Sequence, residues 1–328
     1  MITVLLIGLF ITISYIYVPS SVNVLNEKIK QSSPTTFDEQ RQDLVKEYGD
    51  YLAVGLPKNP PALYFYWLSN QRKISDLRIK YAIEDIKKTQ LVSGQIKIWS
   101  LLNMGTVIKT DKQTLAIDAA NLPFSQALNN LSQLVDVFMV THLDRDHYDQ
   151  ELLRKALDQN KQIIFPDGLT FISDKPDNVS KLKSGETKQI DETKITAYQT
   201  DHRGDGNFDQ PNAWYEIEVE GFKLLHTGDG RDFKNQNESR RVYAARDYDI
   251  LLGNVALHSY NIRDLKPKIF FPLHLFKFMS GQNAYEKSTF QETAKTYLKY
   301  EKDLQDINII YLLPGEGVKI LSNGEVQN

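Results

Sequence analysis

The pattern of hydrophobic and polar residues divides the chain into three parts. An apolar run without a charge extends from Ile2 to Val18. From Val22 to about Gln95 polar residues dominate, and the apolar positions recur with the spacing typical of helices. In the remainder, short apolar runs of strand length alternate with turn residues and helical stretches. The pattern predicts an apolar N-terminal segment at 1–21, a helical extension at 22–95 and a mixed α/β domain at 96–328.

Strand-like runs in the third part have the composition and flanking residues that sheets require. Residues 96–108 and 114–117 flank a Thr-Asp-Lys turn and predict a hairpin. Val135 to Val140 is apolar apart from Asp136, which is typical of a strand covered on both faces. Helical stretches are predicted at about 150–159 and 283–303. Hairpins mixed with helices favour an α/β sandwich over a doubly wound parallel sheet.

The apolar N-terminal segment is short for a membrane span, which needs about 20 residues, and slightly long for the core of a signal peptide. The nearest basic residues, Lys28 and Lys30, follow it, and none precedes it. No polar positions mark a second face, which argues against a buried helix. We therefore expect a signal peptide or a membrane anchor, and a protein that is exported or membrane-anchored.

Composition narrows the possible chemistry. The 328 residues carry a net charge of −3 with 41% hydrophobic residues, as in an ordinary globular protein. This balance gives no support to nucleic-acid binding through a basic field. The chain has no cysteine, so disulfides, thiolate metal sites and cysteine nucleophiles are excluded. Any metal must be held by carboxylates and by the six histidines.

The densest group of candidate ligands directly follows the strand predicted at 135–140. Two histidines and two aspartates, His142, Asp144, Asp146 and His147, lie within six positions. Carboxylates gathered in this way are destabilising unless positive charge lies among them, and a divalent cation would supply it. A solvated polar loop would tolerate the same composition, and this alternative stays open on these residues alone.

Three further predicted strands each end close to a candidate ligand. These residues are His202, Asp229 and His274, and the intervals between them are long enough for each to follow its own strand. Functional residues gather on loops that a rigid scaffold positions, and strand ends converge on one edge of a sheet. The spacing therefore favours one metal site over scattered polar residues.

On these residues the chain resembles the metallo-β-lactamase fold hydrolase superfamily. The family's first motif, H-x-H-x-D-H after a buried strand, corresponds to residues 142–147. The later single His, the Asp of a Gly-Asp pair and the final His match His202, Asp229 and His274 in order. The resemblance covers about residues 96–328 and implies an αββα sandwich. Within the superfamily the chain is most similar to the branch of ascorbate-phosphate lactonase and N-acyl-phosphatidylethanolamine phospholipase D.

The resemblance implies a site for two divalent metal ions. The implied ligands are His142, His202 and the residue at 144 for one ion, Asp146, His147 and His274 for the other, and Asp229 as the bridge. Zinc is the first expectation. Position 144 departs from the common pattern, because it holds Asp where the family usually has His. This carboxylate would favour iron or manganese, or would leave the first site weak.

The implied activity is hydrolysis of an ester, lactone, amide or phosphodiester by a metal-bound hydroxide, with Asp146 orienting the water or accepting its proton. His258 is a candidate acid or substrate-binding residue, His226 a candidate support or an ordinary strand histidine, and Asp118 a support for the ligands. A small-molecule or lipid-like substrate is expected, the latter because of the N-terminal segment and the aromatic run Tyr64–Trp67. The alternative is a catalytically inactive protein of this fold with a binding or structural role.

Overall fold

A computed structural model provides the structure of the chain and describes residues 22–36, 38–53, 61–120, 125–170, 176–202, 208, 210–245, 247–255, 257–274 and 299–328. The predicted N-terminal segment at 1–21 and most of the helix predicted at 283–303 lie outside these residues, as do the side chains of Tyr64–Trp67. Across the described ranges, no helix is both long enough and apolar enough to cross a membrane.

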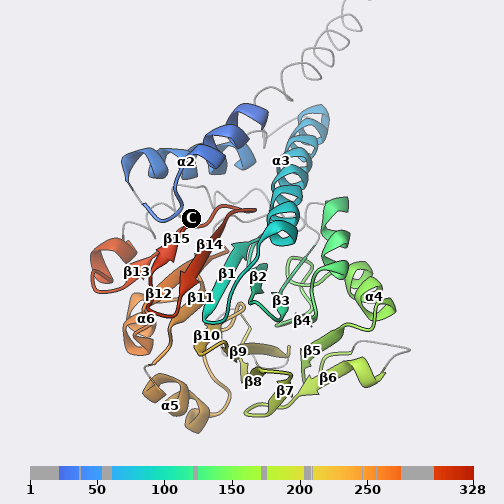
Figure 1. Ribbon diagram of the computed structural model, residues 1–328, viewed down its shortest axis with the longest axis vertical. Coiled ribbons are helices and arrows are strands. Elements are labelled where there is room, and N and C mark those ends of the chain that lie inside the picture. The colour runs from blue at the N-terminus through green and yellow to red at the C-terminus, as the bar shows by residue number, and fades with distance from the viewer. Residues whose placement is uncertain are drawn as a thin grey trace, which may run out of the picture.

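Two β-sheets lie face to face at the centre of the protein (Figure 1). Within the described residues, the first sheet has eight strands in the order β15-β14-β1-β2-β3-β4-β5-β6, and the second has seven in the order β13-β12-β11-β10-β9-β8-β7. The first sheet comprises β1 (Gln95–Ser100), β2 (Thr106–Lys109), β3 (Thr114–Ile117), β4 (Val137–Met139), β5 (Gln162–Pro166), β6 (Val179–Leu182), β14 (Gly317–Leu321) and β15 (Val326–Gln327). The second comprises β7 (Thr187–Ile190), β8 (Thr193–Thr200), β9 (Asn212–Val219), β10 (Phe222–His226), β11 (Ile250–Asn254), β12 (Ile269–Leu273) and β13 (Asn308–Ile309).

Both sheets are mixed. In the first, β1 to β3 pair antiparallel and β3 to β6 pair parallel. In the second, β7 to β10 pair antiparallel and β10 to β13 pair parallel. Parallel neighbours end on the same side, so the carboxyl ends of β4, β10, β11 and β12 can deliver loops to one edge of the sandwich.

The predicted hairpin is present, but its first arm is interrupted. The run 96–108 divides into β1 and β2, because Leu101 N donates to Gly105 O and Gly105 N donates to Leu102 O, both over 2.7 Å. Asn103 lies inside this turn at a φ of 52°. A Cβ at position 105 would lie 2.8 Å from the carbonyl oxygen of Leu102, so the turn requires glycine there.

The sheets pack together through one apolar cluster. Ile98, Leu115 and Met139 of the first sheet share this buried cluster with Ile217 and Leu252 of the second. Residues that alternate with these positions face outward, as the two-residue period of a strand requires. Packing between the two sheets therefore fixes the positions of their strand ends relative to one another.

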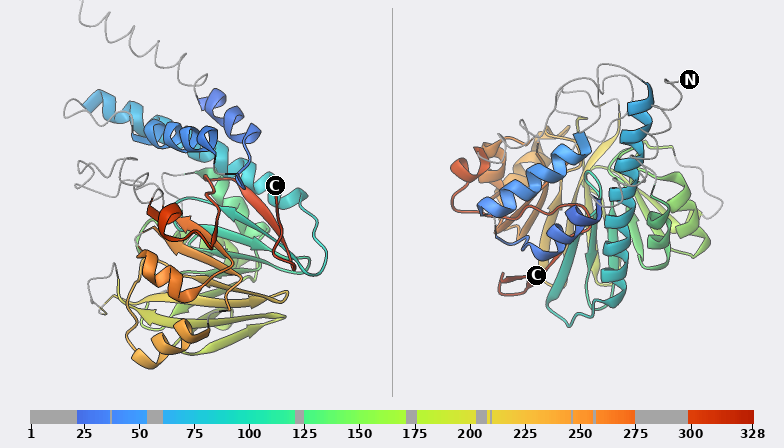
Figure 2. Two further views of the ribbon diagram at one scale, coloured as in Figure 1. Left: turned by 90° about the vertical axis from the view of Figure 1, so that its left-hand side faces the viewer. Right: turned by 90° about the horizontal axis from the view of Figure 1, so that it is seen from above.

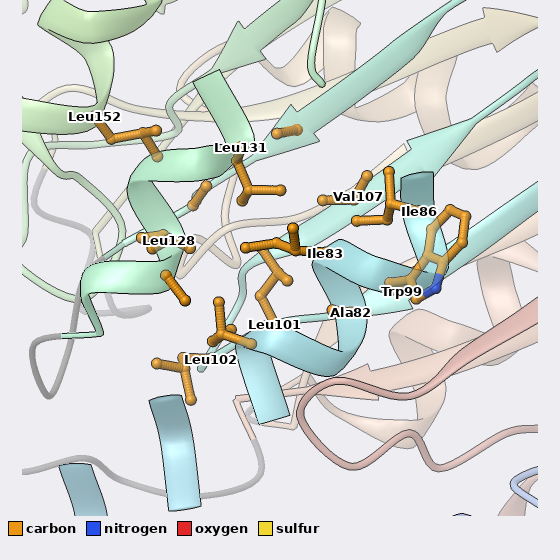
Figure 3. Close-up of a cluster of buried hydrophobic side chains, with 14 of the residues drawn as sticks. Ala82, Ile83, Ile86, Trp99, Leu101, Leu102, Val107, Leu128, Leu131 and Leu152 are labelled. Atoms are coloured by element: carbon orange, nitrogen blue, oxygen red, sulfur yellow. The ribbon is translucent and has the colours of Figure 1, made fainter. Parts of the chain in front are cut away.

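Helices cover the outer face of each sheet (Figure 2). They are α2 (Glu39–Ala53), α3 (Pro61–Lys88), the 3-10 helix η1 (Gln126–Gln133) and α4 (Gln150–Asp158) on the first sheet, and α5 (Gln236–Ala245) and α6 (Ser259–Leu265) on the second. Figure 3 shows Ile86 of α3 beside Trp99 of β1, and Ile83 of α3 between them and Leu131 of η1. On the opposite side, Val242 of α5 packs with Phe270 of β12. The predicted αββα sandwich is confirmed.

The N-terminal helices are also attached by buried polar contacts. Arg41 of α2 donates hydrogen bonds to both carboxylate oxygens of Glu316 and to the main-chain oxygen of Tyr311. Arg78 of α3 donates from Nε to the main-chain oxygen of Pro314 over 2.7 Å. Both guanidinium groups are buried. The segment between β13 and β14 thus connects α2 and α3 to the sandwich.

Candidate metal centre

The ligand-rich segment forms the loop between β4 and α4, at residues 140–149. A turn closes it, because His147 N donates to Asp144 O over 2.9 Å. The loop ends where Asp149 caps α4 by accepting a hydrogen bond from Leu152 N over 2.7 Å. The buried strand at one end and the capped helix at the other fix the backbone that carries the candidate ligands.

His142, Asp144 and His202 form the first group of candidate ligands. Asp144 Oδ2 lies 3.8 Å from His142 Nε2 and 3.4 Å from His202 Nε2. His202 reaches the loop from the end of β8. One ligand atom from each residue lies within 4.8 Å of the others, which is close enough for a single ion.

Asp146, His147 and His274 form the second group, with ligand atoms again within 4.8 Å of one another. Asp146 Oδ2 lies 3.3 Å from His274 Nε2 and 3.8 Å from His147 Nε2. His274 directly follows β12 at a φ of 62°, and its main-chain N–H donates to Asn103 O over 3.0 Å. The turn between β1 and β2 therefore holds one ligand of this group.

Asp229 lies between the two groups. Its Oδ2 is 3.9 Å from His142 Nε2, and its Oδ1 is 3.4 Å from His147 Nε2 and 4.0 Å from His274 Nε2. The residue follows β10, whose neighbour β11 contributes Asn254, a donor to Asp229 Oδ1 over 2.7 Å. A carboxylate with one oxygen toward each group has the placement of a bridging ligand.

The donor atoms fit metal ions. The Nε2 atoms of His142, His147 and His202 are buried, and none has a hydrogen-bond partner within the part of the chain that the structure describes. Buried polar atoms are almost always satisfied, so three such atoms facing carboxylates are suited to bind a cation. Imidazole nitrogen and carboxylate oxygen are ligands of zinc, iron and manganese.

Hydrogen bonds on the far side of the rings set which nitrogen carries the proton. Thr141 Oγ1 donates its single proton to Asp118 Oδ2 over 2.7 Å, so at 2.9 Å it accepts from His142 Nδ1. His147 Nδ1 lies 2.8 Å from the same carboxylate oxygen and donates to it. Both rings therefore turn Nε2 toward the cluster as a lone-pair donor, with Asp118 in the supporting position expected for it.

The cluster shifts the pKa values of its members in opposite directions. Burial, reinforced by the neighbouring His147, lowers the pKa of His142 to about 4. Burial also acts to lower the pKa of His147, but the carboxylates of Asp229 and Asp118 outweigh it and raise that pKa well above its usual value. The pKa of Asp229 lies well below its usual value, because His147 and His274 outweigh the effect of burial. The carboxylates of the cluster therefore favour the protonated form of His147.

The two remaining histidines lie apart from the ligand groups. His226 bonds the main chain through both ring nitrogens, donating to Met104 O at 3.1 Å and accepting from Gly228 N at 3.3 Å, so it shapes the turn before Asp229. His258 is exposed at the start of α6, and its ring stacks on Tyr260 with centroids 5.2 Å apart. No contact among the described residues joins His258 to the ligands, and its catalytic role stays a prediction.

Three side-chain amides in the site were missed by sequence reasoning. Each donates to one candidate carboxylate ligand: Gln210 to Asp144 Oδ1 over 3.0 Å, Asn103 to Asp146 Oδ2 over 3.2 Å, and Asn254 to Asp229 Oδ1 over 2.7 Å. A single amide residue forms no motif, so the pattern of residues carries no signal for these three.

A family model described as the Beta-lactamase superfamily domain matches residues 103–274, just over half of the chain. The chain belongs to the beta-lactamase superfamily. The match begins at Asn103 and ends at His274, so it encloses both groups of candidate ligands. The predicted superfamily is confirmed, and together with the ligand cluster it supports the predicted class of enzyme, a metallo-β-lactamase fold hydrolase.

Solved structures agree on the fold of this beta-lactamase superfamily protein. Igni18, a metallo hydrolase from Ignicoccus hospitalis, is 14% identical over 69% of this chain and 98% of its own, with a TM-score of 0.50. CmlA, a diiron beta-hydroxylase from Streptomyces venezuelae, is 10% identical over 70% of this chain and 54% of its own, with a TM-score of 0.53. At such identities the likeness shows the fold. No curated protein matches the chain.

Proposed function

We propose that this protein is a hydrolase that uses two divalent metal ions to cleave an ester, lactone, amide or phosphodiester bond. The observation that carries this proposal is the pair of three-residue ligand groups with Asp229 between them. The first group would hold one ion and the second the other. Ions bound there would lower the pKa of water and stabilise negative charge on a carbonyl or phosphoryl oxygen.

Asp146 is the candidate proton acceptor. Its Oδ2 accepts a hydrogen bond from Asn103 Nδ2 and lies beside His274 Nε2. Burial acts to raise its pKa, but hydrogen bonding to His274 and the charge of His147 outweigh burial and hold that pKa below its usual value. The carboxylate is therefore ionised at neutral pH, so that Asp146 can orient a water molecule and take its proton.

Zinc is the first metal to test, with iron and manganese as the alternatives that Asp144 favours. An Asp in place of the common His makes the first group more anionic, and harder metals prefer oxygen ligands. CmlA, of similar fold, is named a diiron enzyme, which supports including iron. Metal analysis after separate reconstitution with each ion identifies the one retained.

We propose that the substrate is a small molecule or a lipid-like molecule rather than a nucleic acid. The balanced net charge of −3 supports excluding nucleic acid. The apolar segment at 1–21 would export the protein or anchor it to a membrane, which would bring the site close to lipids. A higher rate on micellar than on soluble substrates of the same bond type is expected, and equal rates would contradict the lipid-like class.

The deciding experiment compares metal-free protein with protein reconstituted with zinc, iron or manganese, on chromogenic phosphodiester, lactone and β-lactam substrates in parallel. We expect one metal to restore turnover of one bond type. Combining His142→Ala and His147→Ala in one variant should abolish that turnover. Retention of less than about half an equivalent of any transition metal would overturn the proposal. The chain would then be an inactive protein of this fold.

A further inference from the structure

The two oxygens of Asp144 have different surroundings. Oδ1 accepts a hydrogen bond from Gln210 Nε2 over 3.0 Å. Oδ2 faces the first ligand group, 3.4 Å from His202 Nε2 and 3.8 Å from His142 Nε2. The amide of Gln210 therefore binds one carboxylate oxygen of Asp144, while the other oxygen faces the two imidazoles of the first group.

Gln210 comes from a stretch of backbone that also contacts the loops of both histidines in this group. Two residues later, Asn212 Nδ2 donates to Thr200 Oγ1 over 2.7 Å and to Asp201 O over 3.2 Å, directly before His202. The next residue, Ala213, donates from its main-chain N–H to Thr141 O over 3.2 Å, directly before His142. Gln210 is thus placed relative to both histidines by main-chain and buried contacts.

The chemistry of an amide suits this position. A carboxamide N–H orients a carboxylate without adding charge, whereas Lys or Arg would compete with a metal for the same anion. Asn103 and Asn254 donate in the same way to Asp146 and Asp229. Each of the three candidate carboxylate ligands therefore receives an amide donor that orients it without adding charge.

We infer that Gln210 is a positioning residue, which fixes Asp144 as a one-oxygen ligand of the first metal and so allows Asp to stand where the family commonly has His. This inference rests on the metal sites of the proposed function. It implies that removing the Gln210 amide weakens one metal site of two. Outer hydrogen-bond partners of metal ligands typically contribute about 10- to 100-fold to metal affinity.

The test titrates cobalt(II) into metal-free full-length protein and records the visible spectrum and the number of ions bound. Gln210→Met keeps the length of the side chain and removes the donor. We expect it to weaken one of the two cobalt sites by about 10- to 100-fold, with the melting temperature of the metal-free protein unchanged. Gln189→Met is the matched control, because Gln189 donates its amide to Asp191 O in a hairpin outside the ligand groups.

Two ligand variants identify the affected site. In a His202→Ala background, which lacks the first site, Gln210→Met should cause no further loss of cobalt affinity. In a His274→Ala background it should weaken the remaining site and change its spectrum. Wild-type affinity in Gln210→Met, or an equal loss in both backgrounds, would overturn the inference. If the wild type binds two ions but hydrolyses no substrate, the proposed function fails while this inference stands.

Discussion

Asp118 accepts a hydrogen bond of 2.8 Å from Nδ1 of His147, and neither side chain is exposed to solvent. The same carboxylate accepts hydrogen bonds from Thr141 N and Thr141 Oγ1 over 2.8 and 2.7 Å. Through Thr141 it also fixes the proton on His142 Nδ1. One buried residue outside the ligand groups therefore orients a histidine in each of them.

Replacing this carboxylate with an amide should weaken metal binding. Asp118→Asn retains one acceptor oxygen, so at least one of its three donors would face an NH2 group. We expect about 10- to 100-fold lower metal affinity and about 1–3 kcal/mol lower stability of the metal-free protein. Competition with a chelator and urea unfolding measure the two effects. Asp136→Asn is the control, because Asp136 is a hydrogen-bonded aspartate that accepts from Thr114 N and Lys161 Nζ. The prediction is refuted if Asp118→Asn binds metal as tightly as the control variant does.

Removing the unusual ligand should remove one ion. Asp144 Oδ2 faces two imidazole nitrogens that have no hydrogen-bond partner in the described residues. Asp144→Ala therefore leaves that group with two histidines and only the shared carboxylate of Asp229. We expect metal analysis to show one ion bound instead of two. Asp144→His should bind both ions and shift the preference toward zinc. Unchanged stoichiometry in Asp144→Ala would show that Asp144 is not a ligand.

Most of the candidate ligands were predictable because each lies next to a strand that hydrophobicity alone reveals. His142 comes just after the apolar residues Val137–Val140, and His202 and His274 follow strands whose apolar residues fill the core. The αββα arrangement came from the resemblance, since local periodicity does not determine how two sheets pack. The sequence pattern predicted one strand where the structure has β1 and β2. The turn at Asn103 that separates them depends on a close backbone approach at Gly105, which the pattern does not reveal.

The contacts that orient the ligands were not predictable. Gln210 lies in a loop without periodicity, and its partner Asp144 is 66 positions away in the chain. The same holds for Arg41 and Glu316, which pair across 275 positions. Such contacts depend on tertiary structure, which places two polar side chains together only after the sheets and helices have packed.

Metal binding should release protons at neutral pH. In the metal-free protein the pKa values of His147 and His274 are raised, because nearby carboxylates outweigh burial. A metal requires the neutral imidazole, so affinity should fall as the pH falls. His142, with a pKa of about 4, is already neutral and contributes no proton. Calorimetry at pH 7 in two buffers of different ionisation enthalpy should give different binding enthalpies, and identical values would contradict the prediction.

The buried ion pair between α2 and the sandwich should stabilise the chain only as a pair. Arg41 and Glu316 are 1% and 7% exposed, and Glu316 Oε2 also accepts a hydrogen bond from Leu313 N. Arg41→Met leaves a buried carboxylate without its cation, which should reduce the free energy of unfolding by about 3–5 kcal/mol. Adding Glu316→Gln should restore part of this loss. Urea unfolding measures the stability of the single and the double variant. The exposed pair Lys28 and Glu47 provides the control, because Lys28→Met should change the free energy of unfolding little. An equally small effect of Arg41→Met would show that α2 is not held by this pair.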